Sequence, residues 1–354
     1  MSKVIKNLCL IMFSICCVML SSTIMASATE TGEFELPVAG TTGYGVIDLM
    51  VRAADDPKSD NWGTIPAGTA FTILEEGNTR FKILTQNGNT GWVSKAHTMV
   101  NLPDLIPSIR YNATNSYDSR YRSCGKSLPG VTGKSFYTGK TENAKLGYEE
   151  YNIPVLFGMA RKIAAAQVAA LADNRTLVIY EGFRPLEVQQ AVNVGLGALM
   201  ETDAAVNRAV AGSGWGKGWF IAKSVSNHQK GFAIDTSLGE VTEWKVCEID
   251  GRAVKIPVGY TEMAMPTEMH ELSPAAASMA YGVNSLSATA WKSVPMAKSM
   301  TDAAKALRTY CVNAGMSPLA SEWWHMNDLD ARAATNAAGT GNFRITGNVS
   351  AALG

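Results

Sequence analysis

The sequence predicts a small all-β barrel near the N-terminus, followed by an α+β domain in which an antiparallel sheet carries flanking helices. Short runs that alternate apolar and polar residues, separated by turns containing Gly and Asn, crowd into residues 38–100, as is typical of short strands. From residue 151 onward, helical patterns mix with strands without the regular alternation of a doubly wound sheet. The chain of 354 residues is long enough for about two domains.

The composition excludes some classes of protein. Apolar residues make up 46% of the chain and charged residues 18%, so a sizeable core can form. The formal net charge is zero, and no basic run or stripe marks a surface for nucleic acid. We therefore predict a folded protein with no nucleic-acid partner.

Residues 1–28 have the features of a secretory signal peptide. Lys3 and Lys6 give a positive start, residues 8–20 are almost wholly apolar, and Ala26-Ser27-Ala28 is a small-x-small cleavage site. The apolar run is shorter than the ~20 residues of a membrane-spanning helix, which argues against the alternative of an N-terminal anchor. We predict a protein that is secreted or associated with the cell wall, with no stable membrane span after cleavage.

Cleavage would leave the three cysteines Cys124, Cys247 and Cys311. Three thiols cannot all pair with one another, so we expect at most one disulfide, and the sequence does not say which. None of them stands in a metal-ligand spacing such as C-x-x-C.

Four runs in the N-terminal region predict the strands of the barrel, at residues 44–52, 70–74, 80–85 and 90–94. Asn87-Gly88 joins the last two as a tight hairpin turn, because glycine accepts a positive φ at little cost.

This region resembles a bacterial SH3-like (SH3b) domain, a resemblance carried by Leu49-Met50-Val51-Arg52, Gly63, Ile65, Gly68-Thr69 and Gly91-Trp92-Val93. The resemblance implies a module that attaches to peptidoglycan. Met50 and Arg80-Phe81, however, stand where the family has an Asn and a Trp-containing pair. Whether the barrel binds peptidoglycan is therefore open. Trp92 is expected in the core or half-buried, and the alternative is that it stacks on a ligand.

Residues 101–150 are rich in Asn, Ser, Tyr, Gly and Lys, so we predict a linker followed by a loop-rich entry to the second domain. The second domain is predicted to span residues 151–335. Residues 336–354 form a small, polar, glycine-containing tail, part of which we expect to be loosely ordered. The expected elements of the second domain are helix 153–171, strand 176–180, helix 185–205, a glycine-rich loop at 212–218, strand 232–238, a hairpin at 241–261 turned at Asp250-Gly251, helix 301–314 and strand 322–326.

Two stretches of this domain carry the residue types of a catalytic metal site. The first runs from Ser226 to Asp235 and contains His228, and the second is Glu322-Trp323-Trp324-His325. Two imidazoles and one carboxylate are a common zinc ligand set, with a fourth position left for water. A nearby Glu that does not bind the metal can take the proton of that water. The alternatives are an ordinary polar pair beside a turn, and a Trp-rich core strand with a chance His.

The spacings set conditions on the backbone. His228 and Asp235 are seven residues apart, Glu322 and His325 are three apart, and an odd offset on a regular strand puts side chains on opposite faces. Gly231 permits a turn that brings His228 back over the strand. For Glu322 a bend or bulge is needed. The Trp pair is expected to exclude water and to raise the pKa of Glu322.

Arg184 follows an apolar strand and precedes a proline. A guanidinium fixed at a strand end can hold a carboxylate by two parallel hydrogen bonds, or steady an oxyanion. The alternative is a surface salt bridge with Glu181 or Glu187.

From about residue 110 to 330 the chain is similar to the zinc D-Ala-D-Ala peptidases, the family of the D-alanyl-D-alanine dipeptidases and related carboxypeptidases. Ser-x-His-x-x-Gly-x-Ala-x-Asp matches at residues 226–235, Glu-Trp-Trp-His at 322–325 and Tyr-x-Gly-x-Arg-Pro at 180–185. Between the first two motifs the chain carries an added stretch at 241–261.

The resemblance implies Zn²⁺ as the cofactor, held by His228, Asp235 and His325. It also implies Glu322 as the general base and Arg184 as a stabiliser of the transition state. The implied substrate is a peptidoglycan stem peptide ending in D-amino acids, and we favour a carboxypeptidase that hydrolyses D-Ala-D-Ala-type bonds. The alternatives are a D-Ala-D-Ala dipeptidase and a non-catalytic wall-binding protein with a structural metal site.

Four further residues are candidates for binding substrate: Ser226, Glu268, Glu271 and Trp324. Ser226 can hydrogen-bond substrate or orient the loop before His228. Glu268 and Glu271 lie where dipeptidases carry an acidic residue for the substrate's free amine, and the choice between them is open. His270 is expected to be a solvated loop residue, and the alternative is a contact with substrate.

Overall fold

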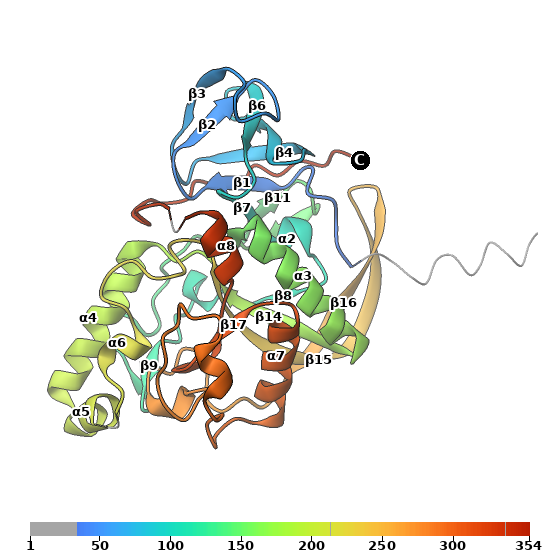
Figure 1. Ribbon diagram of the computed structural model, residues 1–354. Helices are drawn as coiled ribbons and strands as arrows, with labels where there is room; N and C mark the ends of the chain where they lie inside the picture. The colour runs from blue at the N-terminus through green and yellow to red at the C-terminus, as the bar shows by residue number, and fades with distance from the viewer. Residues whose placement is uncertain (1–33, 213, 337) are drawn as a thin grey trace, which may run out of the picture.

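The computed structural model describes residues 34–212, 214–336 and 338–354 (Figure 1). The predicted signal peptide at residues 1–28 lies outside the described residues. Within the described ranges, no helix combines the length and the apolarity needed to cross a membrane. Figure 1 shows a small β barrel, drawn in blue, against one end of a larger body of helices and strands.

The N-terminal barrel is an eight-stranded sheet in the order β13-β7-β1-β4-β5-β6-β2-β3. Strand alternation places Phe71, Ile73, Phe81 and Ile83 in its core, each with no exposed surface. The predicted hairpin turn is present, since Gly88 has a φ of 80°. The predicted run 44–52 is divided, and the strands are β1 (Thr42–Gly45), β2 (Leu49–Arg52), β3 (Asn61–Ile65), β4 (Ala70–Glu76), β5 (Arg80–Thr85), β6 (Thr90–Ser94) and β7 (Thr98–Asn101).

The remaining strand of this sheet, β13 (Pro154–Leu156), follows the barrel by some fifty residues. The sequence predicts a helix from residue 153, but residues 154–156 are extended and pair with β7. The helix, α3 (Phe157–Ala172), begins directly afterwards. The reason is tertiary, because β7 offers an open edge and the side chain of Val155 is completely buried there.

Residues 101–150 hold short elements that attach to both parts of the molecule. β8 lies parallel to β14 in the main sheet. Asp104 is completely buried and accepts hydrogen bonds from the backbone of Thr42 and from the side chains of Asn101 and Asn143. The elements are α2 (Leu102–Leu105), β8 (Arg110–Tyr111), η1 (Thr114–Ser116), β9 (Arg122–Ser123), β10 (Lys126–Ser127), β11 (Thr141–Asn143) and β12 (Tyr148–Glu150).

The second sheet has six strands, five of them in the order β17-β18-β15-β14-β8, with β16 also paired to β15. All of these pairs are antiparallel except β14 with β8. The sheet is therefore mainly antiparallel, as predicted for this domain. Its strands are β14 (Arg175–Glu181), β15 (Ala233–Ile249), β16 (Arg252–Glu262), β17 (Ser317–Leu319) and β18 (Glu322–Asn327).

Helices α3 and α7 (Asp302–Asn313) lie side by side against this sheet (Figure 1). α4 (Leu186–Thr202) and α5 (Ala204–Ala211) form a separate small core away from it. The sequence predicts one helix over 185–205, but Asp203 ends the first helix and caps the second, its carboxylate accepting from the backbone N–H groups of Ala205 and Val206. The remaining helical segments are α6 (Lys217–Phe220), η2 (Pro274–Ala276), η3 (Ala290–Ser293) and α8 (Leu329–Ala334).

The predicted hairpin is confirmed as the long ribbon β15–β16, which projects from the body in Figure 1. Asp250 and Gly251 form its turn, with φ values of 50° and 71°. The strand predicted at 232–238 and the first arm of the hairpin are one continuous strand, β15.

The C-terminal tail differs from our expectation of partial looseness. Residues 338–354 run along the barrel, where the N–H of Ala70 donates to the hydroxyl of Thr346 at 2.9 Å. Further on, the N–H of Ala351 donates to the carbonyl of Gly40, also at 2.9 Å. Near the body, Phe343 stacks on Phe183 with ring centroids 4.9 Å apart. The tail thus contacts both the barrel and the second domain.

Candidate metal centre

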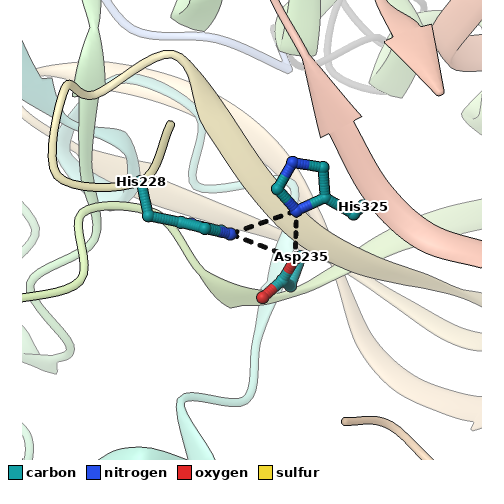
Figure 2. Close-up of side chains that lie close together, drawn as sticks. All are labelled: His228, Asp235 and His325. Carbon is teal, nitrogen blue, oxygen red and sulfur yellow. Dashed lines mark hydrogen bonds and ion pairs between the residues drawn. The ribbon is translucent and has the colours of Figure 1, made fainter. Parts of the chain in front are cut away.

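Three side chains from distant parts of the second domain converge on one point (Figure 2). Asp235 on β15 and His325 on β18 are paired across the sheet, and His228 lies in the turn that leads into β15. Nδ1 of His325 lies 3.1 Å from Oδ1 of Asp235, and Nε2 of His228 lies 3.2 Å from that nitrogen and 3.4 Å from that oxygen. All three residues are buried.

These distances fit a tetrahedral zinc ion. Zinc binds His nitrogen and carboxylate oxygen at about 2.0–2.2 Å, so two ligand atoms of a tetrahedron lie roughly 3.3–3.6 Å apart. The three atoms of the site lie 3.1–3.4 Å apart, close to that range.

The hydrogen bonds on the far side of each ring support the same conclusion. Nδ1 of His228 donates to the carbonyl of Gly182 at 2.8 Å, and Nε2 of His325 donates to Oδ1 of Asn327 at 2.9 Å. In each neutral ring the nitrogen that faces the centre is then the unprotonated one. A partner of this kind, which fixes the tautomer and the orientation, is usual behind a metal-binding His.

The pKa values of the two imidazoles are shifted in opposite directions. Burial lowers the pKa of His228, which keeps its ring neutral. Burial acts in the same direction on His325, but the hydrogen bond to Asp235 and the negative charges of Asp235 and Glu322 together outweigh it, so the pKa of His325 is raised. A metal ion at the centre would displace any proton on Nδ1 of His325, because a ligand nitrogen must be deprotonated.

The predicted turn at Gly231 is what brings His228 to the centre. Gly231 has a φ of 73°, and its N–H donates to the carbonyl of His228 at 3.0 Å. The chain therefore folds back before β15 begins, and the odd spacing between His228 and Asp235 no longer separates their side chains.

The expected irregularity near Glu322 is also present. Leu319 pairs with Glu322 while Pro318 pairs with Met326, so β18 bulges between these two pairs. As a result Oε2 of Glu322 lies 3.6 Å from Nδ1 of His325. Trp323 and Trp324 beside it are each 1% exposed. Burial raises the pKa of Glu322 to about 8, in the direction expected.

Arg184 lies beside the candidate ligand Asp235 and is held by two carboxylates. Its Nη2 donates to Oδ2 of Asp235 at 2.9 Å, and its Nε donates to Oε2 of Glu181 at 2.7 Å. The alternative pairing with Glu181 is therefore present, but it is buried rather than at the surface, and Arg184 also pairs with the candidate ligand Asp235. Nη1 donates to Gln189, which lines the same cleft as Arg184.

Glu181 is a residue of the centre that the sequence suggested only as a salt-bridge partner. A bulge in β14 sets it beside Asp235. Besides Arg184, its carboxylate accepts from Asn115 at 2.8 Å, from Tyr121 at 3.1 Å and from Tyr137. Burial alone would raise the pKa of Glu181, but Arg184 lowers it below its usual range. The second carboxylate thus stays charged and anchors Arg184.

A cleft of about 660 Å³ opens over the centre. Trp219 on α6, which follows the glycine-rich loop, forms part of its wall and is 37% exposed. Of the predicted site residues, those that line the cleft are Arg184, Ser226, His228, Glu322 and His325.

The other predicted substrate contacts lie elsewhere. Glu268 lines a different cavity, of about 470 Å³, with Arg120 3.8 Å away. Both carboxylate oxygens of Glu271 accept backbone N–H groups, from Cys124 and Gly125. Trp324 packs in the core rather than at the cleft.

No motif in the sequence placed His270 at the centre, and our expectation of a solvated loop residue was wrong. His270 is 1% exposed, and its Nε2 lies 3.2 Å from Oδ2 of Asp235. Its ring is stacked on Tyr121 at 4.3 Å. The cysteines Cys124, Cys247 and Cys311 are free thiols.

Residues 48–98 match the family model described as bacterial SH3 domain. The N-terminal barrel is therefore of the SH3b type, within the range 38–100 expected for it. No curated protein matches the chain.

A solved structure titled "Structure of the LdcB LD-carboxypeptidase reveals the molecular basis of peptidoglycan recognition" is similar to 66% of this chain and 88% of its own, at 13% identity and a TM-score of 0.26. A likeness of this strength carries no argument about function. The assignment of an activity depends on the metal centre itself.

Proposed function

We propose that this protein is an exported zinc peptidase that hydrolyses D-Ala-D-Ala-type bonds in peptidoglycan stem peptides, acting as a carboxypeptidase. The observation that carries the proposal is the convergence of His228, Asp235 and His325 at tetrahedral spacing, with Glu322 beside them and a cleft above. A ligand set of two His and one carboxylate with an open side is typical of catalytic rather than structural zinc.

Zinc, when bound, supplies a Lewis acid that polarises the scissile carbonyl and lowers the pKa of water. Glu322 is placed to take the proton of the attacking water and to return it to the leaving amine. Its raised pKa makes it a stronger proton acceptor than an exposed carboxylate. A cation held nearby favours the charged form that the base requires.

Arg184 has two tasks in this proposal. Its Nη2 holds Oδ2 of Asp235, which orients that ligand. Its side chain also lines the cleft, where a guanidinium can stabilise negative charge on the carbonyl oxygen. Glu181 fixes Arg184 in this position through charge-assisted hydrogen bonds.

The choice of carboxypeptidase over dipeptidase depends on the cleft lining. A dipeptidase needs a carboxylate for the free amine of its substrate. Glu322, the proposed base, is the one carboxylate among the described residues that line the cleft. Glu268 opens into another cavity, and Glu271 is engaged by backbone N–H groups. A substrate with a blocked amine, such as a stem peptide, fits this lining better.

The cell-wall setting is supported by the SH3b-type barrel at residues 48–98 and by the predicted signal peptide. The alternative of a non-catalytic wall-binding protein explains neither the open side of the metal centre nor the buried Glu322. A closed structural site needs four protein ligands and no base.

The test is mass spectrometry of the products after the zinc-loaded protein, lacking residues 1–28, meets two substrates. Loss of one alanine from a stem pentapeptide ending in D-Ala-D-Ala would support the proposal. Cleavage of free D-Ala-D-Ala alone would identify a dipeptidase instead. Cleavage of neither would reject the D-Ala-D-Ala assignment. The variant Glu268→Gln, which alters an acid outside the cleft, serves as a control and should retain activity.

A further inference from the structure

We propose that His270 is a positioning residue for the metal centre. Its Nε2–H and the guanidinium of Arg184 together hold Oδ2 of Asp235, so that the carboxylate presents only Oδ1 to the metal. This inference depends on the proposed function only in requiring a metal ion at His228, Asp235 and His325.

The two oxygens of Asp235 have separate sets of partners. Oδ1 faces the ligand nitrogens of His325 and His228, at 3.1 Å and 3.4 Å. Oδ2 faces away, towards Nη2 of Arg184 at 2.9 Å and Nε2 of His270 at 3.2 Å. The two donors hold Oδ2 and leave Oδ1 free for the metal. They also prevent the carboxylate from rotating so that both of its oxygens bind the metal.

The backbone conformation of His270 and the burial of its ring are both energetically unfavourable, as is expected of a residue kept for a positioning role. Its φ of 62° is one that residues other than glycine rarely adopt. Its Nδ1 is buried and has no hydrogen-bond partner among the described residues. A buried polar atom without a partner destabilises the folded state. The polar contact that the ring does make is the hydrogen bond from its Nε2 to Asp235.

The surrounding structure fixes the ring closely. His270 is stacked on Tyr121, with ring planes 9° apart, and the edges of Trp324 and Tyr180 meet it nearly at right angles. The buried Trp324 thus supports the ring of His270, and it does so without contacting substrate.

The backbone around His270 is fastened to the loop at Arg122. The carbonyl of His270 accepts from the N–H of Arg122 at 3.2 Å, and the N–H of Leu272 donates to the carbonyl of Arg122 at 2.7 Å. Glu271, between them, binds the backbone of Cys124 and Gly125. Glu271 therefore anchors the segment that carries His270.

Glu181, Asp235 and His270 also lie close enough together to suggest a second metal site. Arg184 rules this out, because its guanidinium lies between Glu181 and Asp235 and donates to both. A metal cation and a guanidinium cannot occupy the same position. The cluster is therefore a hydrogen-bonded support for Asp235.

The test compares three variants in the full chain without residues 1–28. His270→Phe keeps a ring for Tyr121 but has no donor. His270→Asn tolerates the positive φ but is too short to reach Asp235. His270→Gln keeps an N–H donor at a reach similar to that of Nε2. The control is His97→Gln, which changes a His of the barrel beside Ser94.

The first readout is the dissociation constant for Zn²⁺, measured by competition with a chelator. We expect the Phe and Asn variants to bind zinc about 10- to 100-fold more weakly, as is usual when the partner of a metal ligand is lost. The Gln variant should stay close to the wild type. The second readout is the visible spectrum of the Co²⁺-substituted protein, whose absorption should weaken in the Phe and Asn variants as Asp235 chelates with both oxygens.

Equal zinc affinity and equal Co²⁺ spectra in all variants would overturn the proposal. So would an equal loss in the Phe, Asn and Gln variants, because it would point to packing rather than to the donor. If His270→Phe does not fold, the zinc affinities of the His270→Asn and His270→Gln variants still test the proposal. A wild type that binds zinc tightly but cleaves no stem peptide would refute the proposed function and leave this test intact.

Discussion

Replacing Gly231 by Ala is expected to damage the metal centre from a position outside the ligand set. Gly231 closes the turn that carries His228, and it does so at a φ of 73°. A Cβ at this position would lie 2.8 Å from Sδ of Met99 on β7 and 3.3 Å from Cγ of Leu156 on β13. Met99 and Leu156 are 0% and 1% exposed, so neither side chain can move aside freely.

The magnitude follows from two unfavourable effects and one that opposes them. A left-handed conformation costs an L-residue roughly 1–2 kcal/mol. An extra methyl group in a packed core costs about 1–3 kcal/mol. Alanine also restricts the unfolded chain, which offsets roughly 0.4–1 kcal/mol. We therefore expect the free energy of unfolding to fall by roughly 1–5 kcal/mol, and zinc affinity to fall about tenfold because His228 is displaced.

The assay is urea unfolding of the metal-free protein, together with chelator competition for zinc. Gly88→Ala is a matched control, because Gly88 has a similar φ of 80° but a Cβ there would meet no atom within 4 Å. This control should show only the conformational strain, about 1 kcal/mol after the offset, and normal zinc affinity. If the two variants lose equal stability and Gly231→Ala still binds zinc normally, the contact with Met99 does not matter and the reasoning is refuted.

Four further outcomes are expected. Glu322→Gln should bind zinc as the wild type does but lose about 10²–10⁴-fold in kcat on the stem pentapeptide, and retained hydrolysis would exclude Glu322 as the base. Arg184→Lys should weaken zinc binding as well as kcat, because an ammonium lacks the Nε and Nη1 donors that fix the guanidinium on Glu181 and Gln189, so it holds Asp235 less firmly; an unchanged zinc affinity would contradict this. Burial lowers the pKa of Lys145 from 10.5 to about 8. Below pH 8 the buried ammonium destabilises the folded state. This destabilisation disappears as the pH rises towards 10.5, the pKa of Lys145 in the unfolded chain. The stability of the wild type relative to Lys145→Met should therefore rise between about pH 8 and 10.5, by on the order of 3 kcal/mol, and a flat difference would count against it. Deleting residues 338–354 should speed hydrogen exchange at Ala70, which donates to Thr346, and unchanged protection would show that the tail does not stabilise the barrel.

Local sequence patterns predicted the strands and turns whose conformation depends on residues close to them in the chain. The alternation of the barrel strands and the turn at Asp250-Gly251 needed only the side-chain period and a tolerance for positive φ. The start of α3 could not be found in this way. Residues 154–156 suit a helix, but β7 offers a strand edge that the local sequence does not record.

The proposed metal ligands could be named from the sequence because their residue types and spacing form recognisable motifs. His228, Asp235, His325 and Glu322 do converge, and the irregularities expected at Gly231 and beside Glu322 are present. His270 carried no such signal, since a lone His in a loop looks the same whether it is solvated or buried against Asp235.

The sequence by itself indicated that His228, Asp235, Glu322 and His325 meet, and which backbone turns they need, because ligand chemistry and turn chemistry depend on residue type at short range. The tertiary structure decided which atoms face the candidate metal centre and which residues support them. It placed His270 and Glu181 behind Asp235 and Arg184, and it kept Glu268, Glu271 and Trp324 out of the cleft. These outcomes depend on burial and on hydrogen bonds between residues far apart in the chain, which no local pattern contains.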